Sequence, residues 1–318
     1  MTCPKCEHET IKRFGTYGKS RIQRYRCKDC GATFAEPNSG PKRPLSGHTT
    51  DFDRVVQVFG LLTEGMSIRA ISRLTGVHKT TILGLLNTVG TRCASLLDAK
   101  LQNLRPRYVQ ADEAWTFVHT KQRRLTVNSP VEWGDQYVWL ALDSEAKLIM
   151  SYRVGKRDGL NAYEFIGDLS KRIVNRCQLT TDGLDGYIPA VEEHFGIDVD
   201  FAQLVKQYAP PRTDGPDWFR PSSQVVAAIP TPITGNPKME RISTSHIERA
   251  NLTVRMHLRR FTRLTNGFSK KLSNLKAAVA VFVAWYNFCR VHQTLRVTPA
   301  MEAGITDHVW TLRELLTA

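Results

Sequence analysis

Residues 105–208 show an order of strand-like and helix-like segments that few folds can accommodate. Three strand-like segments come first, and a helical pattern, a buried strand, a short helix and a fifth strand follow. The strand-like segments lie at 105–118, 136–143, 146–155, 177–183 and 198–208, and the longer helical pattern spans 159–174. Three strands in succession are typical of an antiparallel meander. We therefore predict an α/β domain with a mixed five-stranded sheet flanked by helices, in which the fourth strand lies next to the first.

Two acidic residues stand where such a sheet would bring them together. Asp112 lies in the first strand, and Asp182 ends the fourth. Glu113 adjoins Asp112, but successive strand residues face opposite sides, so we expect only one of this pair at a shared site. Asp185 falls in a turn flanked by glycines, where aspartate is common for conformational reasons. Asp182 and one member of the pair Asp112 and Glu113 are therefore the candidates.

A third carboxylate, Glu248, stands in the most basic part of the chain. Residues 241–296 contain eleven Lys or Arg, and Glu248 is their only acid. Three carboxylates converging beside a polyanion need a cation, or they repel one another. Mg²⁺ prefers oxygen ligands, and two such ions can serve an in-line displacement at phosphorus. The alternative for Glu248 is a surface ion pair with Arg255, an interaction that contributes little stability.

The segment around Glu248 also predicts contacts to phosphates. A helix that begins near Thr244 would have a buried face formed by Ile247, Ala250, Val254, Leu258 and Phe261. Asn251, Arg255 and Arg259 would follow Glu248 along a neighbouring stripe. We expect these three residues, with Arg260 and Arg263, to bind DNA.

Four cysteines near the N-terminus have the spacing of a zinc site. Cys3 and Cys6 form one C-x2-C pair, and Cys27 and Cys30 form another twenty residues later. Two such pairs can place four thiolates around one tetrahedral Zn²⁺, which would supply the folding energy that so short and polar a segment lacks. We predict a zinc ribbon at 1–35, and read the remaining three cysteines as core residues.

A helix-turn-helix pattern follows a Pro/Gly/Ser-rich linker at 36–50. Residues 51–100 show three helical segments, with a tight turn at Thr75–Val77 before the third. In such domains the last helix enters the major groove with its N-terminal residues at the bases. We expect His78, Lys79, Thr80 and Thr81 to contact DNA there. The alternative is a three-helix bundle that packs only on its own protein.

Charge and composition favour a nucleic-acid partner. The formal net charge is +14, and residues 1–48 carry ten Lys or Arg against four acids. A strongly basic chain with segregated charge fits a polyanion. No apolar leader and no run long enough to cross a membrane is evident, so we expect a cytoplasmic, nucleoid-associated protein of a bacterial or archaeal cell without a membrane partner. The apolar run at 277–288 predicts a buried helix.

Together these motifs resemble transposases of the insertion sequence one family. The resemblance rests on the four-cysteine ribbon, the helix-turn-helix, "ADEAW", "TTDG" and "HIERANLTVRMHLRRFTRLTNGFSK". It implies an RNase H-like catalytic domain at 105–263 with a long loop at 209–243, followed by a basic helical segment at 264–318. It also implies a DDE triad at Asp112, Asp182 and Glu248 that binds two Mg²⁺ or Mn²⁺ ions.

The resemblance further implies the partners and the chemistry. The substrates would be double-stranded terminal inverted repeats and target DNA. Water would free a 3′-hydroxyl at each end, and this hydroxyl would then attack the target. Two ends must meet, so we expect at least a dimer on DNA. The rival readings are a non-catalytic zinc-ribbon and helix-turn-helix regulator, or another RNase H-like nuclease.

Overall fold

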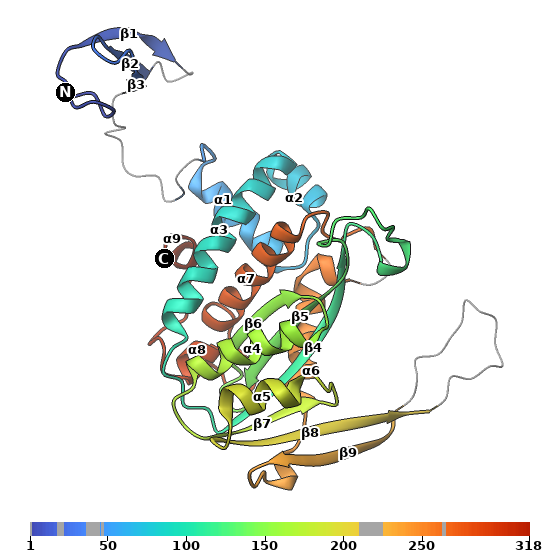
Figure 1. Cartoon of the computed structure of the whole chain (residues 1–318). Coiled ribbons are helices and arrows are strands. Elements are labelled where there is room, and N and C mark those ends of the chain that lie inside the picture. Colours follow the sequence, from blue (N-terminus) through green and yellow to red (C-terminus); the bar gives the residue numbers. More distant parts are fainter. Residues whose placement is uncertain (1, 18–21, 36–44, 46–47, 210–224, 263–264) are drawn as a thin grey trace. The chain divides into compact units, whose positions relative to one another are not determined.

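The computed structural model describes residues 2–17, 22–35, 45, 48–209, 225–262 and 265–318. Contacts divide the chain into two compact units, Met1–Thr49 and Thr50–Ala318. The expected linker at 36–50 falls mostly outside the described residues, as does Arg263. The first unit is a three-stranded antiparallel sheet in the order β1-β2-β3 (Figure 1). Its strands are β1 (Ile11–Tyr17), β2 (Ile22–Cys27) and β3 (Thr33–Ala35).

The second unit begins with three helices whose ends follow from local chemistry. They are α1 (Phe52–Thr63), α2 (Ile68–Thr75) and α3 (Lys79–Lys100). The Ser67 side chain accepts a hydrogen bond from the Ala70 amide and so caps α2. Gly76 ends α2 with a φ of 71°, a left-handed conformation that glycine adopts without strain. The N-cap of α3 is His78. Helices at 51–100 with a tight turn before the third are thus confirmed.

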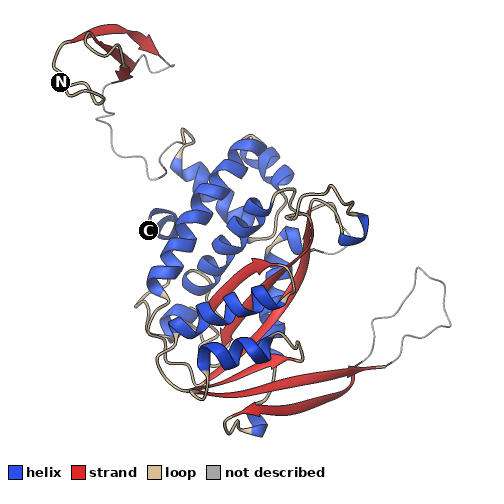
Figure 2. Ribbon diagram, viewed as in Figure 1, coloured by secondary structure: helices blue, strands red, loops and turns tan. Residues whose placement is uncertain are grey.

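The sheet of the second unit has six strands in the order β6-β5-β4-β7-β8-β9 (Figure 2). The strands are β4 (Tyr108–Val118), β5 (Gly134–Asp143), β6 (Ile149–Gly155), β7 (Cys177–Asp182), β8 (Val199–Tyr208) and β9 (Val225–Thr234). The first three form an antiparallel meander. β7 pairs in parallel with both β4 and β8. The mixed sheet and the pairing of the fourth predicted strand with the first are therefore confirmed.

Strand β9 corrects two predictions, the five-stranded sheet and the loop at 209–243. It pairs antiparallel with β8 at the edge of the sheet. Pro230 and Pro232 make this segment look unlike a strand, because proline cannot donate a ladder hydrogen bond. The two prolines are two residues apart, so they occupy equivalent positions in the pairing, and an edge strand tolerates them where the missing N–H would face away from its neighbour. Residues 210–224 of the predicted loop lie outside the described chain.

Helices cover both faces of the sheet (Figures 1 and 2). Helices α4 (Gly159–Arg172) and α5 (Tyr187–Phe195) pack on one face, where the buried Trp139 of β5 contacts Phe165 and Tyr187. Helix α6 (Ser245–His257) packs against β4 and β5 on the other face. The short 3-10 turns are η1 (Gln122–Arg124), η2 (Met239–Arg241) and η3 (Arg259–Phe261).

Helix α7 (Leu272–Phe288) joins the first three helices to the sheet. The predicted buried helix at 277–288 is confirmed, because every residue of that stretch is buried. The side-chain amide of Asn287 both accepts from and donates to the backbone of Ile149, which fixes α7 to β6. Helices α8 (Pro299–Glu302) and α9 (Leu312–Thr317) complete the unit, and α9 contacts α1.

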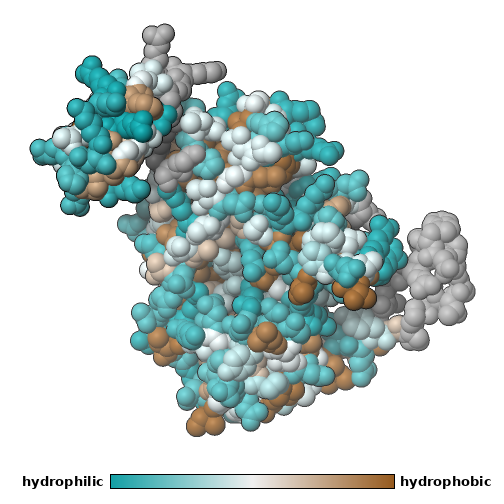
Figure 3. All heavy atoms as spheres, turned by 45° about the horizontal axis from the view of Figure 1, so that its top comes forward, coloured by the Kyte–Doolittle hydropathy of each residue, from teal (hydrophilic) through white to brown (hydrophobic). Residues whose placement is uncertain are grey.

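The surface in Figure 3 shows hydrophobic side chains scattered among hydrophilic ones. Within the described part of the chain, no helix has both the length and the apolar character needed to cross a bilayer.

Candidate active site

The pairing of β4 with β7 brings Asp112 and Asp182 together. The last parallel pair in the register is Ala111 with Thr181, so each aspartate is the next residue on its strand. Carboxylate oxygens of Asp112, Glu113 and Asp182 lie within 4.8 Å of one another. Asp185 is exposed and lies outside this cluster. The choice of Asp182 over Asp185 therefore agrees with the positions of the two side chains.

Asp112 faces helix α6 and is held by it. The Asn251 amide donates to Asp112 Oδ2 at 2.8 Å. Two residues earlier on β4, the Gln110 side chain accepts from the backbone amides of His246 and Ile247 in the first turn of α6. Burial raises the pKa of Asp112 to about 6, and the negative charges of Asp182 and Glu248 act in the same direction.

Glu113 joins the cluster from the opposite face, which corrects the expectation that only one of the two neighbours could do so. Because β7 ends at Asp182, β4 continues past it with no described ladder partner on that side before the isolated bridge from Val118 to Ser269, and side chains from both faces can reach this edge. The Glu113 side chain exposes only 2% of its surface, and it forms an ion pair with Arg157 at 3.2 Å. Burial, then the Asp182 charge, raise its pKa to about 7.

Glu248 lies in the first turn of α6, near Asp112 but outside the 4.8 Å cluster. Its side chain is 45% exposed. Its carboxylate accepts hydrogen bonds from Thr244 Oγ1, at 2.5 Å, and from Lys206 Nζ of β8. Helix α6 thus presents Glu248 at the same edge of the sheet as the two aspartates.

The acidic side chains at this site outnumber the basic side chains that contact them, so the site favours a bound cation. Two basic side chains, Arg157 and Lys206, contact carboxylates of the group formed by Asp112, Glu113, Asp182 and Glu248. One buried acceptor at the site, Asn251 Oδ1, has no hydrogen-bond donor among the described residues, whereas the Glu113 carboxylate interacts with the Tyr187 side chain. A buried oxygen without a donor is costly, and a hard cation or its bound water would satisfy it. The oxygen donor set therefore fits Mg²⁺ or Mn²⁺.

The residues expected to follow Glu248 along one stripe of the helix, Asn251, Arg255 and Arg259, do not form a continuous stripe in the structure. Asn251 is buried against Asp112, so its amide serves the acidic cluster and is not available to a phosphate. Helix α6 ends at His257, and Leu258 has extended backbone angles, so Arg259 lies in η3 and off the stripe. This turn keeps Leu258 and Phe261 buried, as the predicted apolar face requires. Arg255 is half-buried within α6.

The four N-terminal cysteines come together as a second candidate metal site. Their Sγ atoms all lie within 4.8 Å of one another, and the Cys3–Cys30 and Cys6–Cys27 pairs are 3.6 Å apart. Four sulfurs at about 2.3 Å from a central ion would be separated by nearly this distance. The thiolate set thus fits one structural Zn²⁺. Cys93 and Cys177 are buried and Cys289 is half-buried, and none of the three belongs to the quartet.

The residues at the start of α3 are accessible. His78, Lys79 and Thr80 are exposed and Thr81 is half-buried. The His78 ring nitrogen accepts the Thr80 amide and so caps the helix.

Comparisons with known proteins give only weak similarities. No protein-family model and no curated protein matches the chain. Among solved structures, a piggyBac transposase synaptic complex with hairpin DNA is 12% identical, with 87% of this chain and 72% of that chain covered and a TM-score of 0.36. A Mos1 strand transfer complex is also 12% identical, covering 52% of this chain and 60% of that chain with a TM-score of 0.22. A pre-cleavage Mos1 transpososome is 10% identical, covering 52% and 61% with a TM-score of 0.19.

Proposed function

We propose that this protein is a DDE transposase resembling the insertion sequence one family. It would bind terminal inverted repeats, cleave the DNA at their 3′ ends and transfer those ends into target DNA. The observation that carries the proposal is that Asp112 and Asp182 meet from paired parallel strands, with Glu248 near Asp112 on the helix that packs against β4. The basic segment at 241–296 and the basic first unit supply the charge that a DNA partner needs.

Each residue of the site has a role in this proposal. Asp112, Asp182 and Glu248 would hold two Mg²⁺ or Mn²⁺ ions, which when bound activate the attacking oxygen and neutralise charge at phosphorus. Asn251 keeps the Asp112 carboxylate oriented through its hydrogen bond. Arg157 and Lys206 supply positive charge at the edge where a scissile phosphodiester would lie.

The DNA-binding parts of the proposal lie outside the acidic cluster. We propose a zinc ribbon at 1–35, with Zn²⁺ on the four cysteines, and a helix-turn-helix at 51–100. The exposed N-terminal residues of α3 would read bases, and Arg255, Arg259, Arg260 and Arg263 would contact phosphates. At least two copies would act together, because two element ends must be joined in one complex.

The test is a cleavage and joining assay with matched variants. Labelled duplexes taken from the DNA on either side of the gene are incubated with the protein, a supercoiled plasmid and Mg²⁺ or Mn²⁺. We expect 3′-end cleavage and joined products from the wild type. Asp112→Asn and Glu248→Gln should lower both by at least about 100-fold, as expected for groups that act in the transition state. Asp185→Asn, an exposed acid nearby, serves as the control.

Three outcomes would contradict the proposal. Sequence-specific binding without cleavage in either metal would favour a non-catalytic regulator. Cleavage that depends on DNA shape and ignores the end sequence would favour another RNase H-like nuclease. Equal activity of Glu248→Gln and the wild type would show that the third carboxylate is misassigned.

A further inference from the structure

Two neighbouring pockets of the second unit are lined by cations and by no described Asp or Glu. The first, of about 1000 Å³, has Lys121, Arg124 and Arg260 in its wall. The second, of about 720 Å³, lies beside it and shares Arg260, Thr265, Asn266 and Phe268 with the first. A pocket whose charged side chains are all positive favours an anionic ligand.

A third pocket shows that this charge pattern is not general. It measures about 590 Å³, and its cations Arg153, Arg172 and Lys276 are balanced by carboxylates. Arg172 pairs with Asp168 and Asp98, and Arg153 pairs with Glu164. The first two pockets therefore have an unbalanced positive charge, which the third pocket lacks.

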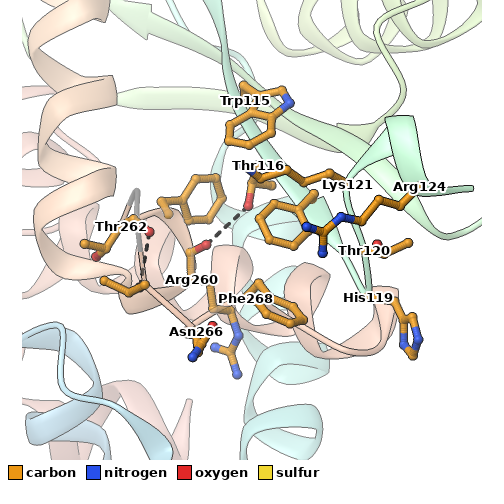
Figure 4. A pocket seen from close by; sticks show the side chains of 13 residues that line it. Trp115, Thr116, His119, Thr120, Lys121, Arg124, Arg260, Thr262, Asn266 and Phe268 are labelled. Carbon is orange, nitrogen blue, oxygen red and sulfur yellow. Dashed lines mark hydrogen bonds between the residues drawn. The ribbon is translucent and has the colours of Figure 1, made fainter. Parts of the chain in front are cut away.

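Arg260 is the charge that most needs a partner. Its guanidinium has no hydrogen-bond or ion-pair acceptor among the described residues, and in Figure 4 it lies beside Asn266. Burial lowers its pKa to about 10. Its backbone carbonyl accepts a hydrogen bond from Thr116 Oγ1 at 3.3 Å, so the residue is anchored to β4. A half-buried cation without a counter-charge favours an anion, and a phosphate would provide one.

Aromatic rings line the same pocket. Phe117 lies with its ring centroid 4.8 Å from that of Phe268 and 5.8 Å from that of Trp115. Figure 4 shows Trp115 and Phe268 with the three cations around the first pocket, and Phe117 lines it as well. Aromatic faces next to cations are the combination that binds unstacked bases together with their phosphates. A volume of this order is at the upper end of the range that accommodates small-molecule ligands.

The pocket lies close to the acidic cluster along the same strand. Trp115 follows Asp112 by three residues, about 10 Å of extended chain, and by strand alternation it lies on the face of β4 that carries Glu113 of the same cluster. That length is roughly three stacked nucleotides of a DNA strand. One continuous strand could therefore have a phosphate at Asp112 and a nucleotide in the pocket.

We propose that this pocket binds one unstacked nucleotide of the DNA strand that is processed at the acidic cluster. The base would lie against Trp115, Phe117 and Phe268, and its phosphate would bind Arg260, with Lys121 and Arg124 at the rim. This inference rests on the proposed function for the identity of the polymer. It adds a binding site for an unpaired nucleotide next to the cleaved bond.

The experiment compares two DNA probes on the full-length protein. One is a blunt duplex, and the other is the same duplex with a single unpaired 2-aminopurine near one end. Stacking of one base should make the second probe bind about 5- to 100-fold more tightly, as measured by anisotropy, and should quench its fluorescence. Arg260→Gln and Phe268→Leu should reduce the preference to about twofold. Arg260→Lys, which keeps the charge, should retain part of it.

Lys276→Gln is the matched control, because it removes one charge from the balanced third pocket. It should leave the preference unchanged, and circular dichroism should show every variant folded. Equal affinity of the wild type for both probes would overturn the inference, and so would a full preference in Arg260→Gln. If Asp112-dependent cleavage persists without the preference, only the nucleotide pocket fails. If neither probe binds at all, the proposed function fails with it.

Discussion

Asp112 and Glu113 leave β4 on opposite faces, yet both carboxylates reach one edge and both have raised pKa values. The values are about 6 and about 7, and burial is the main cause for each. A carboxyl whose pKa is higher in the folded than in the unfolded chain stabilises the fold below its unfolded pKa. That stability is lost as the pH rises through the folded value. Without Mg²⁺, the second unit should therefore be less stable at about pH 8 than at about pH 5.

Glu113→Gln tests this prediction. The amide keeps the shape and removes the charge, so it should raise the free energy of unfolding by about 1 to 3 kcal/mol at about pH 8. At about pH 5 it should change little, because Glu113 is already protonated there. Urea unfolding at both pH values, with zinc present and Mg²⁺ absent, measures the difference. Asp185→Asn, on an exposed turn, is the control. A variant that loses stability at both pH values would show that the Arg157 ion pair outweighs burial.

At the scale of elements, helices α3 and α7 cross at a point that admits no side chain. A Cβ placed on Gly90 would lie 2.5 Å from both Cα and Cβ of Ala277, and 2.8 Å from its carbonyl oxygen. Alanine is the better helix former by about 1 kcal/mol, but backbone atoms cannot move aside as a flexible side chain can. Gly90→Ala should therefore lower the free energy of unfolding by about 2 kcal/mol in urea.

Gly60→Ala on α1 is the matched control for that prediction. There a Cβ would meet only Leu312 Cδ1, at 3.6 Å, which is an ordinary contact. The helix propensity then decides the sign, so a gain of up to about 1 kcal/mol is expected. Two alanine variants that change stability in the same direction would mean that steric fit at the α3–α7 crossing does not control this packing.

These elements also show what sequence patterns can and cannot predict. Apolar periodicity encodes which face of an element is buried, so the order of the first five strands and the inner face of α6 follow from it. It does not encode what a side chain meets across the fold. The prolines of β9 make its sequence unlike that of a strand, so the edge strand was not predicted. The hydrogen bond from Asn251 to Asp112 exists only once α6 packs on β4.

At the acidic site, too, some contacts follow from the sequence pattern and others arise only from the packing of distant elements. Asp112 and Asp182 could be predicted because strand pairing alone brings them together. Strand alternation predicts that only one of Asp112 and Glu113 can lie at the site. That rule holds within a paired ladder and fails to separate carboxylates where the neighbouring strand ends. The contact of Glu248 with Lys206 depends on β8, a strand distant in sequence, and no local pattern predicts it.

For the whole molecule, the two units differ in what holds them together. Among the described residues of Met1–Thr49, only Cys3, Cys27 and Leu45 are buried, whereas the second unit has an extensive apolar core. So small a core cannot offset the conformational entropy lost on folding. The first unit should therefore depend on Zn²⁺, and the second should not.

Removal of zinc should thus unfold one unit and leave the other intact. We expect one Zn²⁺ per chain by metal analysis, its loss in Cys27→Ser, and its retention in Cys93→Ala, where the thiol is buried in α3 far from the quartet in sequence. Hydrogen exchange should show amides of β1–β3 losing protection on chelation, because without the metal their strands have no core to pack on.

Protection in β4, β7 and α7 should persist, since their apolar contacts involve no cysteine–metal bond. If the first unit kept its protection without zinc, strand pairing alone would suffice for its fold. If α7 lost protection as well, the two units would fold as one.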